Sequence, residues 1–269
     1  MNENNNSKTI RQLAALSRAQ LIGKYGLAIF VTLLITTIEL GLTLLTEANV
    51  ITSTPSGYLT GVVISIIVDL LLGILVFGQA NFYLKIARGS KEFSFADIFR
   101  GLKGLTDKTI LVQSVFTGFS VLALIPSVLI HFGIIYTPAE YYYYLLIGVD
   151  FLQIVLIGLA KLFFGLSVYL LADNPEWSVS QIFKESLYRM KNKKGKLLLT
   201  YLSTLPLLIL SIIPCGIGVL WFTPYFNNLM ANFYLDTIGE EPWAPKPYGM
   251  PPAPTEPPKD DSPTLDIRL

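Results

Sequence analysis

Six long apolar stretches divide the chain, and polar or charged segments separate them. The stretches cover residues 25–46, 58–84, 109–136, 144–172, 197–213 and 216–235. A transmembrane helix needs about 20 mostly apolar residues, so this pattern predicts an all-α polytopic membrane protein with six transmembrane helices. The fifth stretch is short, and the sixth contains Pro224 and three asparagines. A re-entrant pair that turns at residues 214–216 is therefore the alternative for the last two.

Basic residues are confined to one side of this predicted bundle. Of the 20 lysines and arginines, all except Lys161 fall in the N-terminal segment, in segments 85–108 and 184–196, or in the C-terminal tail. Basic residues near the ends of spans stay in the cytoplasm. We therefore expect a multi-pass protein of the cell membrane with both termini in the cytoplasm. A re-entrant last pair would also leave the tail on that side.

Two of the basic connections have the pattern of short amphipathic helices. Ser94 with Asp97, and Ser178 with Gln181, have the spacing of a capping box at a helix N-terminus. Apolar residues then follow at helical spacing: Phe95, Ile98, Phe99 and Leu102 in the first, and Val179, Ile182, Phe183, Leu187 and Met190 in the second. We expect both helices to lie at the inner interface, with the apolar face toward lipid or the bundle.

The pentapeptide ANFYL occurs at residues 80–84 and 231–235, at the predicted cytoplasmic ends of spans two and six. Span four ends in the same Tyr-Leu step, at residues 169–170. The repetition predicts three parallel hairpins whose even-numbered spans end in a tyrosine at the headgroup level. Interface anchoring does not account for the asparagines, so Asn81 and Asn232 are candidate contacts between the repeats.

Three regions follow from these patterns. Residues 1–24 form an amphipathic cytoplasmic segment, residues 25–238 the six-helix membrane domain, and residues 239–269 a cytoplasmic tail. The tail holds nine of the 16 prolines and few aliphatic residues. Such a segment cannot bury enough apolar surface to fold, so we expect it to be disordered.

Composition agrees with lipid as the surrounding solvent. Hydrophobic residues make up 52% of the chain and charged residues 14%, against roughly 25% charged residues in soluble domains. The mean hydropathy is +0.54. One cysteine, Cys215, and one histidine, His131, exclude an internal disulfide and a Cys/His zinc framework. We expect no metal, no cofactor and no nucleic-acid partner.

Five ionisable residues fall inside the predicted spans, where charge is costly and marks functional sites by default. They are Glu39, Asp69, His131, Asp150 and Lys161. A helical rise of about 1.5 Å per residue places the first four in the outer half. Two interpretations are open. The four residues line one water-filled vestibule for a proton or cation, or each of them is hydrated or paired by itself near the surface. Asp69 lies too deep to reach water without a cavity. Lys161, about 9 Å deeper, is the cation that could pair with it, as a structural ion pair or a transport element.

Several short motifs occur in the second half of the chain. They are LADNP at residues 171–175, Ser186 and Met190 in the next helix, Gly-Ile-Gly at residues 216–218, the pair Pro224 and Tyr225, and Phe-Tyr-Leu at residues 233–235. Together they resemble a family of bacterial integral membrane proteins, domain of unknown function 975, over residues 8–238. The resemblance implies a membrane protein without an established activity. The long outer hairpin around residues 131–144 and the proline-rich tail depart from the family pattern.

Within the LADNP motif, Asp173 or Asn174 is expected to cap or turn the chain, and Pro175 to stop the helix. This structural interpretation is favoured over ligand binding.

The sequence contains no motif for hydrolysis or phosphate handling. The leading hypothesis is therefore a non-enzymatic scaffold, regulator or accessory subunit, whose cytoplasmic helices and basic segments engage membrane lipids or a membrane-protein partner. The alternative is a small-solute or proton-coupled transporter that uses Asp69 and Lys161, since carriers are often built from repeats with a binding site near the midplane. An intramembrane enzyme has the least support, because no nucleophile is paired with a base.

Overall fold

The computed structural model describes residues 7–49, 54–102, 104–136, 139–214 and 216–245. Within these ranges the protein is entirely helical and contains no strand. The helices are α1 (Ile10–Leu21), α2 (Tyr25–Asn49), α3 (Pro55–Ala87), the 3-10 helix η1 (Phe95–Leu102), α4 (Thr106–Tyr136), α5 (Tyr141–Phe164), α6 (Ser167–Asp173), α7 (Val179–Met190), α8 (Lys194–Ile212) and α9 (Val219–Ile238). Most of the tail, from residue 246 on, and Cys215 lie outside the described residues.

Four segments are long and apolar enough to cross a membrane. They are Tyr25–Leu44, Pro55–Ala87, Tyr141–Asp173 and Lys194–Ile212. A fifth is added if the two parts of α4, Thr106–Leu122 and Leu124–Ile134, count as one span bent by 42°. Several apolar helices of this length are what a membrane protein requires.

Two departures from straight, apolar helices have local causes. The bend in α4 lies close to Pro126, which has no N–H and collides with the preceding turn of a helix. The sixth predicted span corresponds to α9, which is not among the candidate spans. Pro224 and the asparagines reduce the apolar character of α9.

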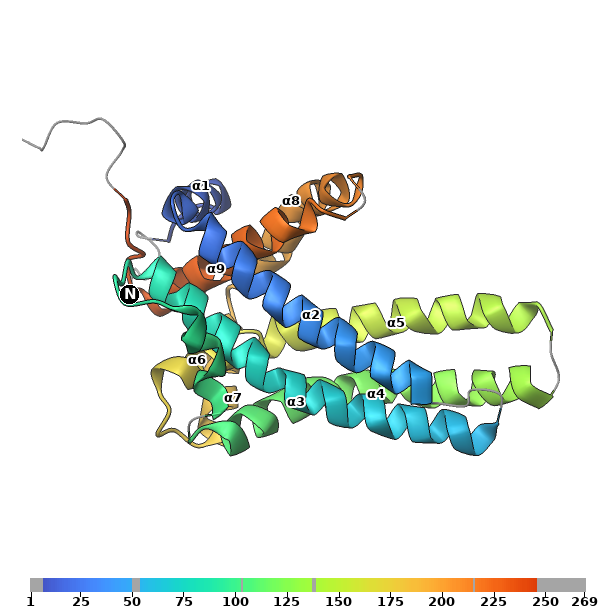
Figure 1. The fold of residues 1–269 in the computed structure, drawn as a ribbon. Coiled ribbons are helices and arrows are strands. Elements are labelled where there is room, and N and C mark those ends of the chain that lie inside the picture. Colours follow the sequence, from blue (N-terminus) through green and yellow to red (C-terminus); the bar gives the residue numbers. More distant parts are fainter. Residues whose placement is uncertain (1–6, 50–53, 103, 137–138, 215, 246–269) are drawn as a thin grey trace, which may run out of the picture.

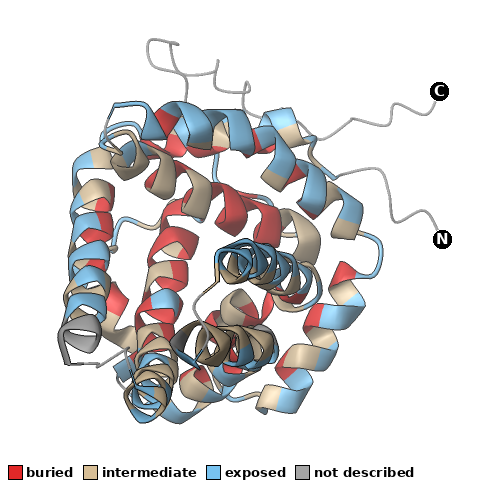
Figure 2. Ribbon diagram, turned by 90° about the vertical axis from the view of Figure 1, so that its right-hand side faces the viewer, coloured by how far each residue is buried: buried red, intermediate tan, exposed pale blue. Residues whose placement is uncertain are grey.

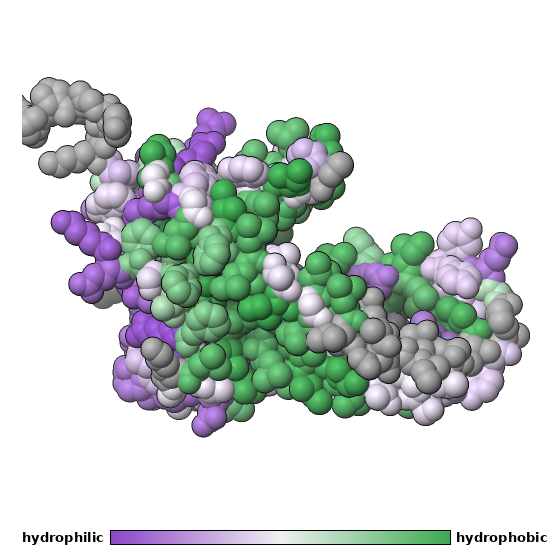
Figure 3. Space-filling model, in the orientation of Figure 1, coloured by the Kyte–Doolittle hydropathy of each residue, from purple (hydrophilic) through white to green (hydrophobic). Residues whose placement is uncertain are grey.

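The helices are arranged as antiparallel neighbours. Contacts join α2 to α3, α4 to α5, and α8 to α9. In Figure 1 the helices α2 to α5 extend together toward one end of the molecule, whereas α8 diverges from them and α1 lies across the opposite end. The space-filling view shows a broad hydrophobic surface over the middle of the molecule and hydrophilic residues at the end that carries α1 (Figure 3).

Helix α9 lies at the centre of the packing. It contacts α1, α2, α3 and α8, and Figure 2 shows buried positions on the inward faces of the surrounding helices. Tyr83 and Tyr234 are 0% and 1% exposed. The prediction that these tyrosines anchor the protein at the interface is therefore wrong, because α3 and α9 pack against other helices at this level.

Both predicted cytoplasmic helices form. Helix α7 begins with a complete capping box, in which Ser178 accepts from the backbone N–H of Gln181 and Gln181 accepts from that of Ser178. Its residue Ile182 is fully buried. The first segment is a 3-10 helix rather than an α-helix, and there Asp97 accepts from the backbone N–H of Ser94 at 2.9 Å.

Candidate functional site

A partly open cavity of about 330 Å³ lies between α3, α4, α5, α6, α8 and α9, and Lys161 on its wall is exposed. Its wall is mostly apolar, and its polar lining residues come from distant parts of the sequence. Those used below are Asp69, Gln113, Lys161, Tyr169 and Tyr201. The volume lies at the lower end of the range of about 300–1,000 Å³ that is typical of small-molecule sites.

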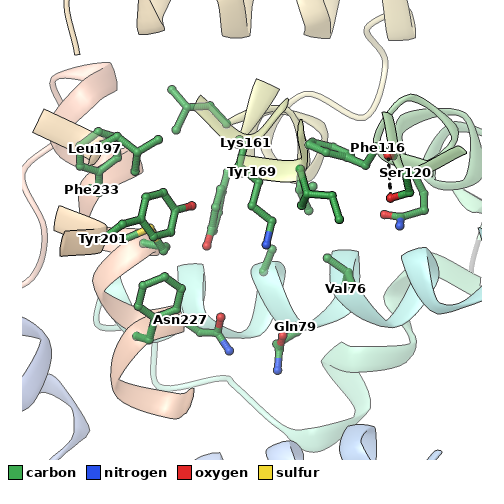
Figure 4. A pocket seen from close by; sticks show the side chains of 18 of the residues that line it. Val76, Gln79, Phe116, Ser120, Lys161, Tyr169, Leu197, Tyr201, Asn227 and Phe233 are labelled. Carbon is green, nitrogen blue, oxygen red and sulfur yellow. Dashed lines mark hydrogen bonds between the residues drawn. The ribbon is translucent and has the colours of Figure 1, made fainter. Parts of the chain in front are cut away.

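Lys161 points into this cavity from α5 (Figure 4). Among the residues that the structure describes, its ammonium group has neither an ion pair nor a hydrogen-bond partner. The hydroxyl groups of Tyr169 and Tyr201 line the same space and also lack partners there. Tyrosine hydroxyls inside a protein usually find a hydrogen-bond partner. The cavity therefore presents one cation and two hydroxyl groups that are free to bind a ligand or water.

Asp69 lines another part of the same cavity, on α3. Its carboxylate accepts hydrogen bonds from two residues of α4, Gln113 at 3.3 Å and Thr117. The ion pair with Lys161 that the sequence suggested is not formed. Lys161 lies about six residue rises deeper along its span, roughly 9 Å, and the α4 donors are closer to Asp69. Asp69 is thus hydrogen-bonded to neutral donors, and among the described residues the ammonium of Lys161 has no charged partner.

The helix that carries Lys161 is interrupted just beyond it. Helix α5 ends at Phe164 and α6 begins at Ser167, although the two form one apolar segment. The backbone N–H of Gly165 donates to the carbonyl of Lys161 at 2.9 Å, and Gly165 and Leu166 both line the cavity. Gly165 and Leu166 both keep right-handed helical backbone angles, so the break is a local change of hydrogen bonding within one apolar segment.

The other three ionisable residues of the spans lie apart from this cavity. His131 stacks on Tyr58, with ring centroids 4.0 Å apart. Glu39 is half-buried on α2, and Asp150 is exposed on α5. Within the described part of the chain, no hydrogen bond or ion pair joins any two of the five residues, and no group of three or more His, Cys, Asp or Glu side chains is placed to hold a metal ion.

The two asparagines of the ANFYL repeats are buried and bind different partners. Asn81 accepts a hydrogen bond from Arg100 of η1 at 2.5 Å. Asn232 donates to Ser17 and Gln20 of α1, at 2.9 and 2.8 Å. No hydrogen bond joins Asn81 to Asn232 among the described residues. Asn81 therefore holds η1 against the bundle and Asn232 holds α1, and neither contact joins one ANFYL segment to the other.

The ends of α3, α6 and α9 meet at one arginine. Arg88 follows α3 and forms ion pairs with Asp173, at 2.6 Å, and with Glu240, at 2.7 Å. Asp173 also accepts from the hydroxyl of Tyr234 at 2.8 Å. Hydrogen bonds to Asp173 and then to Glu240 raise the pKa of Arg88 above its ordinary value. This role of Arg88 is not predictable from the sequence, because nothing local distinguishes Arg88 from the other basic residues near it.

The remaining motif residues have structural surroundings. Asn174 caps α6, since its backbone N–H and its side-chain amide both donate to the carbonyl of Leu170, at 2.9 and 3.2 Å. The carbonyl of Pro175 accepts from Lys108. Pro224 is buried inside α9, and the next residue, Tyr225, is 7% exposed.

Comparison with known proteins adds one match. A family described as "Protein of unknown function (DUF975)" matches residues 1–240. No curated protein and no solved structure matches the chain.

Proposed function

The chain belongs to the family described as protein of unknown function (DUF975), and from its geometry we propose that it is a multi-pass membrane carrier. In this proposal a small solute binds in the central cavity through a negatively charged group placed beside Lys161. The observation that carries the proposal is the Lys161 ammonium, which points into a cavity of about 330 Å³ and has no partner among the described residues.

An unpaired charge in a membrane-embedded site is costly. A bound carboxylate or phosphate group would pair with the ammonium and accept from the hydroxyls of Tyr169 and Tyr201.

Asp69 restricts the class of solute. Its carboxylate lines the same cavity, so a second negative charge on the solute would be repelled. A monoanion or a zwitterion fits this arrangement better than a dianion does. Asp69 is also the residue at which a proton could accompany the solute.

We place the protein in the cell membrane with six crossings and both termini in the cytoplasm, because the basic residues cluster at one end of the bundle. The single cysteine tests the last two crossings. Cys215 falls between α8 and α9 in the sequence. A membrane-impermeant maleimide added to intact cells labels Cys215 if α8 and α9 cross fully. A lack of labelling, with full labelling after the membrane is permeabilised, would favour a re-entrant pair instead.

Transport is tested with the full chain in liposomes. We would measure uptake of radiolabelled lactate, a monoanion, and of radiolabelled alanine, a zwitterion. Uptake of one of them should rise with the amount of protein and fall at least tenfold in Lys161→Gln. A matched control is Lys194→Gln, because Lys194 lies over the ring of Phe163 and does not line the cavity. Uptake that is absent for both probes, or equal in Lys161→Gln and wild type, would contradict the proposal.

A second candidate function is a non-enzymatic accessory subunit or scaffold. It is favoured by the hydrophilic end of the molecule (Figure 3), which would present a charged surface to a partner. If the full chain purifies from native membranes with one partner in fixed proportion, and transports neither probe, this second function is supported over the carrier.

A further inference from the structure

A second pocket, of about 420 Å³, lies where α1 and the start of α2 meet the α8–α9 hairpin. Three of its polar lining residues, Arg18, Tyr25 and Tyr225, lie close enough to interact electrostatically and form what we call its polar end; Ser211 of α8 also lines the pocket. The rest of the wall is mostly apolar and includes Leu207 and Trp221. It shares no lining residue with the central cavity, so an inference from it does not depend on the carrier proposal.

Three side chains at the polar end have no hydrogen-bond partner among the described residues. Arg18 is exposed in the last turn of α1. Within the described residues its guanidinium has no ion pair or hydrogen bond, and neither do the hydroxyls of Tyr25 and Tyr225. Tyr225 is 7% exposed, and a tyrosine buried to this degree usually finds a partner for its hydroxyl. A guanidinium with two phenol donors at one site matches a phosphate group.

The apolar wall indicates what is attached to that phosphate. Leu207, Leu210 and Trp221 are 43%, 61% and 52% exposed, and they lie on the hairpin beyond the polar end of the pocket. Residues 214 and 218, next to the turn of the hairpin, line its far side. The pocket therefore has a cationic end beside the amphipathic helix α1 and an apolar trough that leads away from it along α8 and α9.

We propose that this pocket binds an anionic phospholipid. Its phosphate lies against Arg18, Tyr25 and Tyr225, and an acyl chain lies along the α8–α9 hairpin. Arg18 supplies the positive charge of the pocket, and basic residues near the membrane surface attract anionic lipid. A free phosphate would leave the apolar trough uncovered, and a lipid covers both parts. In this arrangement Tyr225, which belongs to the Pro-Tyr motif, binds the lipid phosphate.

The binding is tested by native mass spectrometry of the purified full chain, titrated with phosphatidylglycerol or with phosphatidylcholine. We expect the first phosphatidylglycerol to bind at least tenfold more tightly than phosphatidylcholine. Arg18→Gln should remove that preference, and Tyr225→Phe should weaken it. Arg11→Gln is the matched control, since Arg11 is also on α1 and does not line the pocket. Equal binding of the two lipids, or a preference that survives in Arg18→Gln, would overturn the proposal.

The position of the lipid is tested by fluorescence. With Trp177 and Trp243 replaced by phenylalanine, Trp221 is the only tryptophan left of the three in the chain. Phosphatidylglycerol brominated on its acyl chains should quench Trp221 at a lower mole fraction than brominated phosphatidylcholine does, and Arg18→Gln should abolish the difference. If inorganic phosphate removes the lipid preference at millimolar concentration, the site takes free phosphate and the lipid assignment fails.

Discussion

Arg88 and Asp173 form a bidentate ion pair between the ends of α3 and α6. The two guanidinium nitrogens Nη1 and Nη2 lie 2.6 and 2.8 Å from the carboxylate oxygens Oδ1 and Oδ2. Arg88 also donates to Glu240, at 2.8 and 2.7 Å, just beyond the end of α9. One side chain therefore fixes the relative positions of three helix ends that are far apart in the sequence.

Replacing this arginine should destabilise the bundle. Charge-assisted hydrogen bonds contribute about 1.5–3 kcal/mol each, and the side chains of Arg88 and Asp173 are 33% and 18% exposed, so solvent screens part of this. We expect Arg88→Ala to lower the free energy of unfolding by about 2 kcal/mol, measured by denaturant unfolding in detergent. Arg88→Lys should recover part of the loss, because a lysine cannot donate to both carboxylates with the same geometry.

Arg189 provides the control for that measurement. Among the described residues it pairs with Glu185 alone, one turn away on α7, at 2.7 Å, and ion pairs at this helical spacing contribute about 0.3–0.5 kcal/mol. Equal losses in Arg88→Ala and Arg189→Ala would show that the junction of α3, α6 and α9 carries no special stability.

Gly78 sets how closely η1 packs on α3. A Cβ atom at this position would lie 1.7 Å from the carbonyl oxygen of Ile98, and Ile98 is fully buried. We expect Gly78→Ala to displace η1 at a cost of about 1–3 kcal/mol, the usual range for overpacking. Hydrogen exchange of residues 95–102 should become faster. Gly118→Ala has nothing within 4 Å of the added atom and should leave exchange in η1 unchanged; faster exchange in both variants would contradict the explanation.

Elements defined by local spacing are predictable from this sequence. The capping box of α7 depends on two residues three positions apart, and it forms as predicted. Apolar length likewise identifies α2, α3, α5 with α6, and α8 as candidate spans. Such features depend on nearby residues, whose spacing the sequence states directly.

Features that depend on the relative placement of helices are not predictable in the same way. Asp69 and Lys161 line one cavity but do not pair. Whether they pair depends on the rotation of α3, α4 and α5 about their axes and on the offset of these helices along the bundle, and hydropathy defines neither. Arg88 meets Asp173 across 85 positions of the chain. A partial signal existed for that pair, because both residues stand at the C-terminal ends of apolar stretches and carry opposite charges.

Gln20 joins α1 to the rest of the bundle through several side-chain hydrogen bonds. It is 1% exposed, and its amide nitrogen donates to the carbonyl of Trp243 at 2.7 Å and to the side chain of Asn232 at 3.1 Å. Its amide oxygen accepts from Asn228 and Asn232, each at 2.8 Å. Because a buried group that loses its partner costs about 1–3 kcal/mol, Gln20→Ala should release α1.

The release is measured by hydrogen exchange of residues 10–21, which should become faster in Gln20→Ala. Arg11→Ala changes the exposed face of the same helix and should leave exchange nearly as in wild type. If the two variants behave alike, the polar contacts of Gln20 do not hold α1 in place.

Trp243 holds the start of the tail against the C-terminal end of α3. Its backbone N–H donates to the carbonyl of Ala87 at 2.9 Å, and the ammonium of Lys24 lies 4.8 Å from its ring centroid. The ring also covers Gly89, where an added Cβ would lie 2.3 Å from the indole. Gly89 has φ +69, a conformation that residues with a Cβ rarely adopt.

Two variants should therefore free the tail by different routes. Trp243→Ala removes the ring, and Gly89→Ala displaces it while leaving the tail sequence intact. In both, we expect a protease that cuts in the tail to act at least several-fold faster near residue 241 than in wild type, with the helices uncut. Gly195→Ala, with nothing within 4 Å of the added atom, is the control. Faster cleavage in Trp243→Ala alone would mean that the tryptophan protects its own site locally, and that its contact with Gly89 does not anchor the tail.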